Sequence, residues 1–359
     1  MKQYHDLLKQ ILGRGDVEYE PRTKTHTIGI SGAFSVYDLR EGFPLMTTKN
    51  VPPRLPFEEV LWKLRGERNV KGLVDRNVHI WTANAFDRHL REKDLREEIP
   101  KHSQRWNEEF DSYKERIATD PEFASTAGDL GPVYGYQWRH WRGPRGGEVD
   151  QLTNLLNNIR EKPGSRYHAL SSWNVGELSE MALGPCPFWH QFSVYGDNID
   201  LTMVQRSCDV FLGVPFNITQ DALLLELVAR ETGLKPRFFK HMPINVHDYL
   251  GVSPRSDFWD NQGNISEFQR RFREVTDRDG YSKLKDWYLE NAPAESKGNE
   301  NKDHTPFILE QLSKEPRALP RIELADIPLL EAIHKSALEI ATITGYKPHK
   351  WDSKATMAA

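Results

Sequence analysis

One stretch in the second half of the chain constrains the fold more than any other. Residues 189–195 and 198–204 predict two β-strands, because Gly196-Asp197 between them is a hairpin signal and apolar and polar residues alternate in the second. A strong helical pattern at 220–232 and an extended segment at 238–249 follow. Nowhere do strands and helices follow the repeated strand–helix–strand rhythm of a doubly wound parallel sheet. The sequence therefore predicts an α+β fold.

Helical spacing recurs in the first half of the chain. It predicts helices near residues 1–13, 57–64 and 151–160. Residues 86–127 are rich in Glu, Arg and Lys, yet aromatic residues recur there at helical spacing. The pattern is consistent with a helical insertion packed on the surface. The simpler alternative, a solvated pair of charged helices, is the one we favour. Residues 292–304 predict a polar loop of a composition typical of disorder.

Charge and cysteine content exclude several classes of protein. The net charge is -4, and Lys and Arg are interleaved with Asp and Glu, so we expect no stable nucleic-acid partner. No apolar run is long enough to cross a bilayer, and the amphipathic start is unlike the hydrophobic core of a signal sequence. Only two cysteines occur in 359 residues, which is typical of a protein of the reducing cytoplasm.

Both cysteines lie close to residues that could bind a nucleotide. Cys186 follows a proline, and Cys208 sits directly after Arg206 and Ser207, a guanidinium and a hydroxyl suited to phosphate. Asn217 offers a donor and an acceptor side by side, which complements the O4 and N3–H edge of uracil. C6 of a pyrimidine is an acceptor for a thiolate, and addition there makes C5 nucleophilic. A cysteine is more often a small buried core residue, and this reading suits Cys208 better than Cys186.

The joint spacing of several motifs resembles the thymidylate synthase family. The motifs are, in chain order, Arg22-Thr23, FPLMTTK at 43–49, LGPVYG at 130–135, SWNVGEL at 172–178, LGPC at 183–186, QRSCD at 205–209, LGVPFNI at 212–218 and YKPH at 346–349. Because the resemblance covers most of the chain, we expect a single domain over 1–359, with insertions at about 86–127 and 251–305. It implies a large mixed β-sheet with flanking helices, and a homodimer joined back to back through its sheets.

The resemblance also implies the ligands and the residues that hold them. The substrate would be dUMP, the co-substrate 5,10-methylenetetrahydrofolate, and no metal is expected. The phosphate would be held by Arg22, Arg206 and Ser207, with Arg166 of the partner subunit. Asn217 would read the base, and His247 and Tyr249 would hold the sugar 3′-hydroxyl.

The remaining roles implied by the resemblance concern catalysis and the folate. Cys186 would be the nucleophile on C6, Glu59 would order the water that moves protons, and Tyr134 would help to remove the C5 hydrogen. Asp209 would hold the pterin. Lys49, Trp81 and Gly213 would line the folate site.

The chain departs from the synthase pattern at several places. Pro187 follows the cysteine where synthases usually have histidine, and Tyr167 replaces the second residue of an Arg-Arg pair. Asn84 stands where a second tryptophan is usual, 243–245 reads Pro-Ile-Asn instead of Gly-Gly-Asp, and the chain ends in Ala359. Several of these changes would open the folate side to water, whereas hydride transfer needs a dry, aligned donor.

We therefore favour the hydroxymethylase branch of the family, with 5-hydroxymethyl-dUMP as the product. Enzymes of that kind are associated with bacteriophages that modify the bases of their DNA, and such an enzyme would act in the host cytoplasm. The alternatives are a thymidylate synthase that makes dTMP and a cytidylate hydroxymethylase, although Asn217 favours uracil where the cytosine enzymes carry Asp. A non-catalytic nucleotide binder is disfavoured by the joint presence of Cys186, Glu59 and Tyr134.

Overall fold

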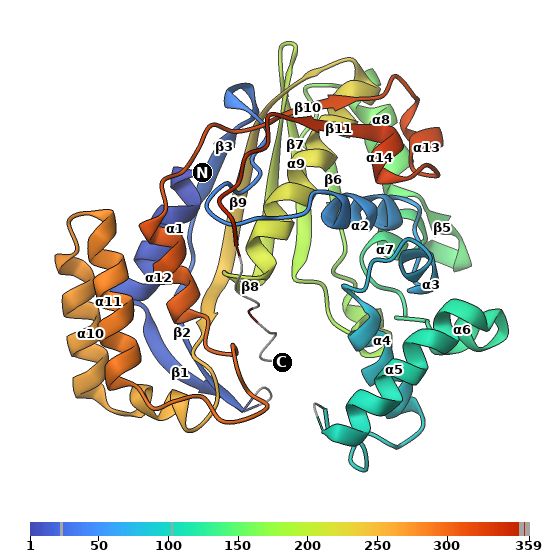
Figure 1. Cartoon of the computed structure of the whole chain (residues 1–359). Coiled ribbons are helices and arrows are strands. Elements are labelled where there is room, and N and C mark those ends of the chain that lie inside the picture. The colour runs from blue at the N-terminus through green and yellow to red at the C-terminus, as the bar shows by residue number, and fades with distance from the viewer. Residues whose placement is uncertain (22–23, 102, 352–354, 356–359) are drawn as a thin grey trace.

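The computed structural model describes residues 1–359 except 22–23, 102, 352–354 and 356–359, so Arg22 and Ala359 lie outside the described residues. Its centre is one seven-stranded sheet (Figure 1). The strands run in the order β1-β2-β9-β8-β7-β6, and β3 pairs with β9 on the same edge as β2. Their bounds are β1 Asp16–Glu20, β2 Thr25–Ser31, β3 Ser35–Asp38, β6 Ala169–Ser171, β7 Pro187–Tyr195, β8 Asn198–Asp209 and β9 Lys235–Tyr249.

The sheet is mixed because one neighbouring pair is parallel. β8 and β9 run side by side in the same direction, whereas the other pairs of this sheet are antiparallel. The helix α9, Gly213–Thr232, makes the crossover between them. The predicted hairpin is present, with Gly196 at φ 58° in its turn. The predicted α+β class, with a large mixed sheet and flanking helices, is confirmed.

Helix α9 packs along one face of the sheet and forms the middle of the core. It is buried on nearly every side and ends at Gly233, whose φ of 71° is the left-handed C-terminal stop that glycine favours. Around it stand α1, α2, α8 and α12 (Figure 1). Their bounds are α1 Lys2–Arg14, α2 Arg54–Leu64, α8 Gln151–Glu161 and α12 Thr305–Ser313.

Two elements extend beyond their predicted limits, and both extensions matter for the site. β8 continues past residue 204 to Asp209, and α9 begins at Gly213 instead of at 220. Pro215 lies in the first turn of α9, where its missing N–H breaks no intrahelical hydrogen bond. The motif residues 205–209 are therefore on a strand, and Asn217 is on a helix.

The segment 86–127 is not a solvated pair of charged helices, and that favoured expectation is wrong. It forms α5, Gln104–Thr119, and α6, Pro121–Ala127, which pack with α4, Thr82–Glu92. Trp106, Tyr113 and Ile117 are at most 5% exposed and belong to a second hydrophobic cluster that also contains Trp81. The charged residues occupy the outer face, which is why they dominate the composition.

The loop at 292–304 is held by specific contacts, contrary to its disorder-like composition. The Glu295 carboxylate accepts hydrogen bonds from the backbone N–H groups of Asn301, Lys302 and Asp303 at 2.8, 3.1 and 3.1 Å. Asp303 is 2% exposed and accepts a hydrogen bond of 2.8 Å from the Tyr288 hydroxyl. The loop follows α10, Gln262–Glu274, and α11, Arg278–Asn291, which pack against α1 and α12.

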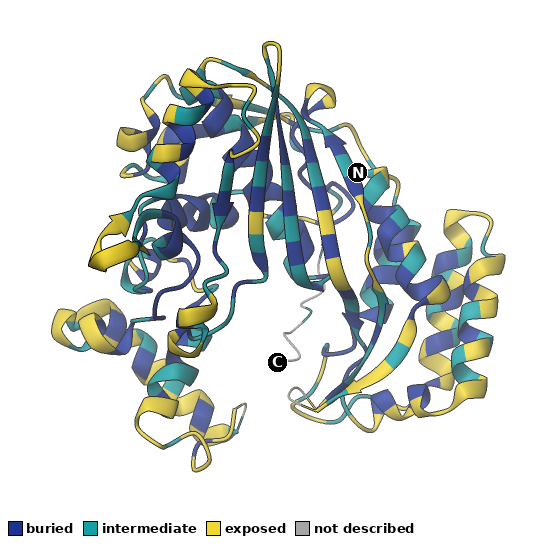
Figure 2. Cartoon of the chain, turned by 180° about the vertical axis from the view of Figure 1, so that it is seen from behind, coloured by how far each residue is buried: buried dark blue, intermediate teal, exposed yellow. Residues whose placement is uncertain are grey.

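The second face of the sheet carries none of the helices that the structure describes. Figure 2 shows it from behind, with intermediate and exposed residues along its strands. Trp189, Met242 and Ile244 are 37%, 41% and 45% exposed. Within the described ranges no helix is long and apolar enough to cross a membrane, and no group of three potential metal ligands was found there.

Candidate active site

Cys186 lies at the entrance to β7, directly before its first residue, Pro187. The thiol-bearing residue is half-buried, and its carbonyl oxygen accepts a hydrogen bond of 2.9 Å from the backbone N–H of Arg206 on β8. Cys208 differs because it is fully buried, and burial raises the pKa of its thiol well above the ordinary value. The expectation that Cys208 is a packed residue is confirmed.

Arg206 fastens the loop that carries Cys186. Its Nε donates to the carbonyl oxygen of Pro185 at 2.9 Å, and its Nη2 donates to that of Gly184 at 2.5 Å. The guanidinium also lies 5.8 Å from the centre of the Trp173 ring. A fixed cation therefore contacts the backbone of the loop that carries the nucleophile candidate.

Tyr134 contacts the same loop from the other side. Its hydroxyl oxygen accepts a hydrogen bond of 2.9 Å from the backbone N–H of Cys186. The side chain is 3% exposed, and burial, with a smaller effect of Cys186, raises its pKa well above the ordinary value, so the phenol stays protonated. Its backbone has φ 34° and ψ -102°, a sparsely populated conformation of the sort found at functional sites.

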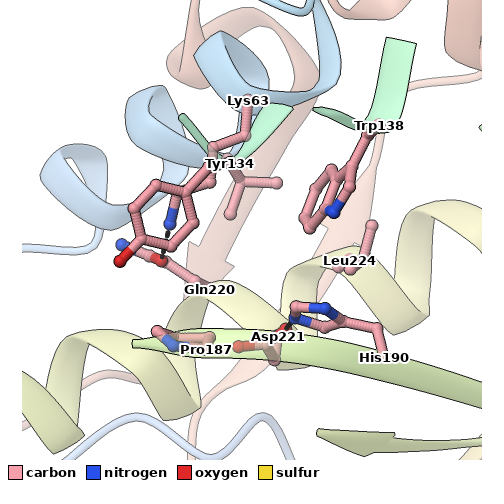
Figure 3. A pocket seen from close by; sticks show the side chains of 9 residues that line it. Lys63, Tyr134, Trp138, Pro187, His190, Gln220, Asp221 and Leu224 are labelled. Atoms are coloured by element: carbon pink, nitrogen blue, oxygen red, sulfur yellow. Dashed lines mark hydrogen bonds and ion pairs between the residues drawn. The ribbon is translucent and has the colours of Figure 1, made fainter. Parts of the chain in front are cut away.

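Glu59 lies in a buried polar cluster next to Tyr134. Its Oε1 accepts a hydrogen bond of 3.0 Å from Trp81 Nε1 and lies 2.9 Å from Lys63 Nζ. Its Oε2 accepts one of 2.5 Å from Gln220 Nε2 on α9. Figure 3 shows Lys63, Tyr134 and Gln220 together around a cavity of about 10 Å³, which is just enough for a single water molecule.

A chain of hydrogen bonds orients the base-reading candidate Asn217. Burial lowers the pKa of His241 to about 4, so this histidine is neutral at pH 7. Its Nε2 lies 2.9 Å from Gln205 Oε1, which can only accept, and Gln205 Nε2 donates to Asn217 Oδ1 at 2.9 Å. The amide N–H donors of Asn217 and one lone pair of its oxygen therefore stay available for a ligand.

The carboxyl ends of β8 and β9 bring the remaining nucleotide-binding candidates together. In the parallel register Ser207 is opposite Asn245, and Asp209 is opposite His247. The rings of His247 and Tyr249 lie 5.2 Å apart at the end of β9. Ligands bind at such strand ends in open sheets, so this edge is a suitable sugar and phosphate site.

Three of the folate-side candidates, Asp209, Lys49 and Gly213, lie near the start of α9, whereas the fourth, Trp81, contacts Glu59. Asp209 Oδ1 accepts hydrogen bonds from the N–H groups of Phe211 and Leu212 at 3.0 and 2.9 Å. Lys49 Nζ donates to the carbonyl oxygen of Phe211 at 2.6 Å, and burial lowers its pKa to about 7, against a smaller opposing effect of Asp209. A Cβ on Gly213 would lie 3.5 Å from Asp209 Cβ and 3.8 Å from Asn217 Oδ1, so Gly213 lies next to both candidates.

Arg166 is the one described candidate that is exposed. It lies between α8 and β6. Sequence reasoning also missed several residues of the site: Lys63, Gln220, Gln205 and His241. The spacing of Glu59 and Lys63, a glutamate four residues before a lysine on one helix, was a signal for the first of these.

Comparison with known proteins identifies relatives along the whole chain. A profile described as thymidylate synthase matches residues 2–359. A protein of Mesoplasma florum named thymidylate synthase is 45% identical over 251 residues, which are 70% of this chain and 82% of that protein. A protein of Listeria monocytogenes, also named thymidylate synthase, is 34% identical over 359 residues, which are 97% of this chain and 97% of that protein. This alignment spans both predicted insertions. On these matches, the chain belongs to the thymidylate synthase family.

Proposed function

We propose that the protein transfers a one-carbon unit from 5,10-methylenetetrahydrofolate to C5 of dUMP and reduces it to give dTMP. The family is one of one-carbon transferases that use this folate, and the relatives named above are thymidylate synthases. The observation that carries the proposal is the loop of Cys186, held between Arg206 and Tyr134. This reductive reading replaces hydroxymethylation as the first candidate.

The residues of the site suit the first half of this reaction. The Cys186 thiolate would add to C6 while Asn217, oriented by Gln205, binds the uracil edge. Tyr134 and the water ordered by Glu59 would then move the C5 proton. Trp81, Asp209 and Gly213 would hold the folate, which would supply the electrophilic carbon and the hydride.

The proposal is tested by incubating the protein with dUMP and methylenetetrahydrofolate. We expect dihydrofolate, seen by its absorbance, and a nucleotide product heavier than dUMP by one CH₂ group. Cys186→Ser should abolish both signals, and Asn217→Asp should shift the preference from dUMP toward dCMP, since a carboxylate accepts from the amino group of cytosine. Turnover of dCMP by the parent protein would contradict the assignment of the base.

Hydroxymethylation of dUMP is the second candidate, and a particular observation favours it. Asn84 is half-buried in the first turn of α4, three residues after the folate candidate Trp81, at a position where a second tryptophan is usual in synthases. Water would then add to the exocyclic methylene, and the products would be 5-hydroxymethyl-dUMP and tetrahydrofolate. In the same assay this branch gives a product heavier by CH₂O and no dihydrofolate.

We further propose a homodimer that joins the uncovered faces of two sheets. Exposed apolar residues on a sheet, such as Trp189, Met242 and Ile244, mark an interaction surface. Arg166 is exposed beside β6 at the edge of this sheet, which suits its predicted donation to the phosphate site of the partner. A reducing cytoplasm, whether of a cell or of a phage host, would keep the Cys186 thiol reactive.

A further inference from the structure

A buried lysine stands one helical turn after Glu59 on α2. Lys63 Nζ lies 2.9 Å from Glu59 Oε1 and donates to Gln220 Oε1 at 2.8 Å. Because Gln220 Nε2 in turn donates to Glu59 Oε2 at 2.5 Å, the three side chains form a closed ring of contacts. All three are at most 5% exposed, so the ring is shielded from solvent.

The surroundings of this ring belong to the active-site candidates. Lys63 Nζ lies 4.7 Å from the centre of the Tyr134 ring, and Trp81 Nε1 holds the same carboxylate oxygen as Lys63 does. Figure 3 shows Lys63 and Gln220 on one side of the small cavity, with the ion pair of His190 and Asp221 further along it.

Packing alone does not account for a charge pair at this place. Taking an ammonium and a carboxylate out of water costs several kcal/mol for each ion, and a buried pair returns little net stability compared with apolar side chains of similar size. An aliphatic residue at position 63 would fill the space next to Tyr134 without that cost. The pair does, however, fix both the orientation and the charge of Glu59.

We propose that Lys63 is a positioning residue that holds Glu59 as an oriented carboxylate, with Gln220 as the bridge between them. This inference rests on the proposed function, in which Glu59 orders the water that moves protons. Lys63 does not need to touch the substrate. It acts through Glu59, whose carboxylate also accepts from Trp81 and Gln220. A carboxylate has about four lone-pair positions, so these three donors leave one for water.

The pH dependence of turnover tests this role. In Lys63→Met the buried carboxylate loses its cation, and burial then favours its protonated form. We expect the acid limb of the kcat profile with dUMP to move up by about one pH unit or more, while KM for dUMP changes less than about threefold. Lys63→Gln, which can still hydrogen-bond but carries no charge, should show the same movement and is the fallback if Lys63→Met does not fold.

The chain offers a matched control. Lys71 on α3, Lys71–Val74, forms an ion pair of the same spacing with Asp75, but at the surface and outside the site. Lys71→Met should leave the kcat profile where it is in the parent protein. An acid limb that stays in place in both Lys63 variants would overturn the proposal.

A double-mutant cycle distinguishes action through Glu59 from a general structural role. We expect Lys63→Met alone to lower the single-turnover rate by about tenfold or more at pH 7. If Lys63 acts through Glu59, the same substitution in a Glu59→Gln background should change that rate by less than about threefold. Equal losses in both backgrounds would contradict the inference. Failure of the proposed function is recognised separately, because the parent protein would then give no product from dUMP.

Discussion

At the scale of single residues, Tyr134 links backbone strain to the position of the nucleophile. Its φ is positive, and its hydroxyl oxygen accepts the hydrogen bond of the Cys186 N–H. A buried N–H without a partner costs about 1–3 kcal/mol. The hydrogen bond to Tyr134 avoids this cost and so stabilises the observed conformation of the Cys186 loop.

We therefore expect Tyr134→Phe to lower kcat by on the order of 100-fold, since it removes both the anchor of the loop and a proton-transfer group. The matched control is Tyr113→Phe. Tyr113 is also a buried tyrosine, whose hydroxyl donates to the carbonyl oxygen of Ala127 at 2.7 Å, but it lies in the segment 86–127. Steady-state kinetics and thermal melting of both variants check this, and equal kcat losses would contradict the assignment.

At the scale of elements, the packed core of the segment 86–127 gives a stability prediction. Trp106 is 5% exposed and stacks on Phe110 at 4.7 Å between ring centres. Trp106→Ala should lower the free energy of unfolding by about 3–5 kcal/mol, as expected for a large core residue. Denaturant unfolding measures it, with Glu109→Ala on the exposed face of α5 as the near-neutral control. A loss below about 1 kcal/mol for Trp106→Ala would point back to a solvated helix pair.

The loop after α11 gives a pH-dependent prediction. Burial raises the pKa of Asp303 from 3.8 to about 6, against a smaller opposing effect of Arg255. The folded protein then holds a proton that the unfolded chain has released by pH 5. The retained proton therefore stabilises the folded protein. Its contribution to the free energy of unfolding, about 3 kcal/mol, is fully present below about pH 4 and is lost as the pH rises through 6.

Asp303→Asn has no such proton, so its free energy of unfolding should fall less between pH 5 and pH 8 than that of the parent protein. Denaturant titrations at these two pH values give the comparison. The asparagine oxygen can still accept the hydrogen bond of Tyr288, whereas the amide group cannot accept that of the Thr305 N–H. This loss is the same at both pH values, so it cancels in the comparison. Parallel pH profiles for the two proteins would rule out Asp303 as the source of the proton.

These elements also show what the sequence could predict. The hairpin, α1 and α8 were found because their periodicity lies within one short segment. The start of α9 was missed because Gly213, Pro215 and Asn217 are typical of turns, and the helix gains its stability from burial on all sides. The core of 86–127 was missed because its apolar residues are few and find their partners in other segments.

The same limit applies to the site. Motifs identified Cys186, Arg206 and Asn217, which the fold places directly before β7, on β8 and on α9, and their roles stay predictions. Their supporting partners come from far along the chain: Gln220 meets Lys63 across 157 residues, and His241 meets Gln205 across 36. Contacts of that range depend on the fold and have no local pattern.

At the scale of the whole molecule, the sheet separates a helix-covered face, which forms the core, from an open face. If the open faces of two copies pair, the exposed apolar residues become buried, and Trp189→Lys should split the dimer by placing a charge in that interface. Sedimentation at several protein concentrations would detect the monomer. A parent protein that is monomeric at micromolar concentration would contradict the proposed assembly.

The predicted donation of Arg166 allows a stronger test, because it makes each active site a product of two chains. Arg166→Ala and Cys186→Ser should each be nearly inactive alone. When the two variants are unfolded together and refolded as a mixture, half of the dimers are mixed. Each mixed dimer contains one site with both residues intact, so about a quarter of the parent activity should return. If Arg166 instead serves the site of its own chain, no mixed dimer has an intact site and no activity returns.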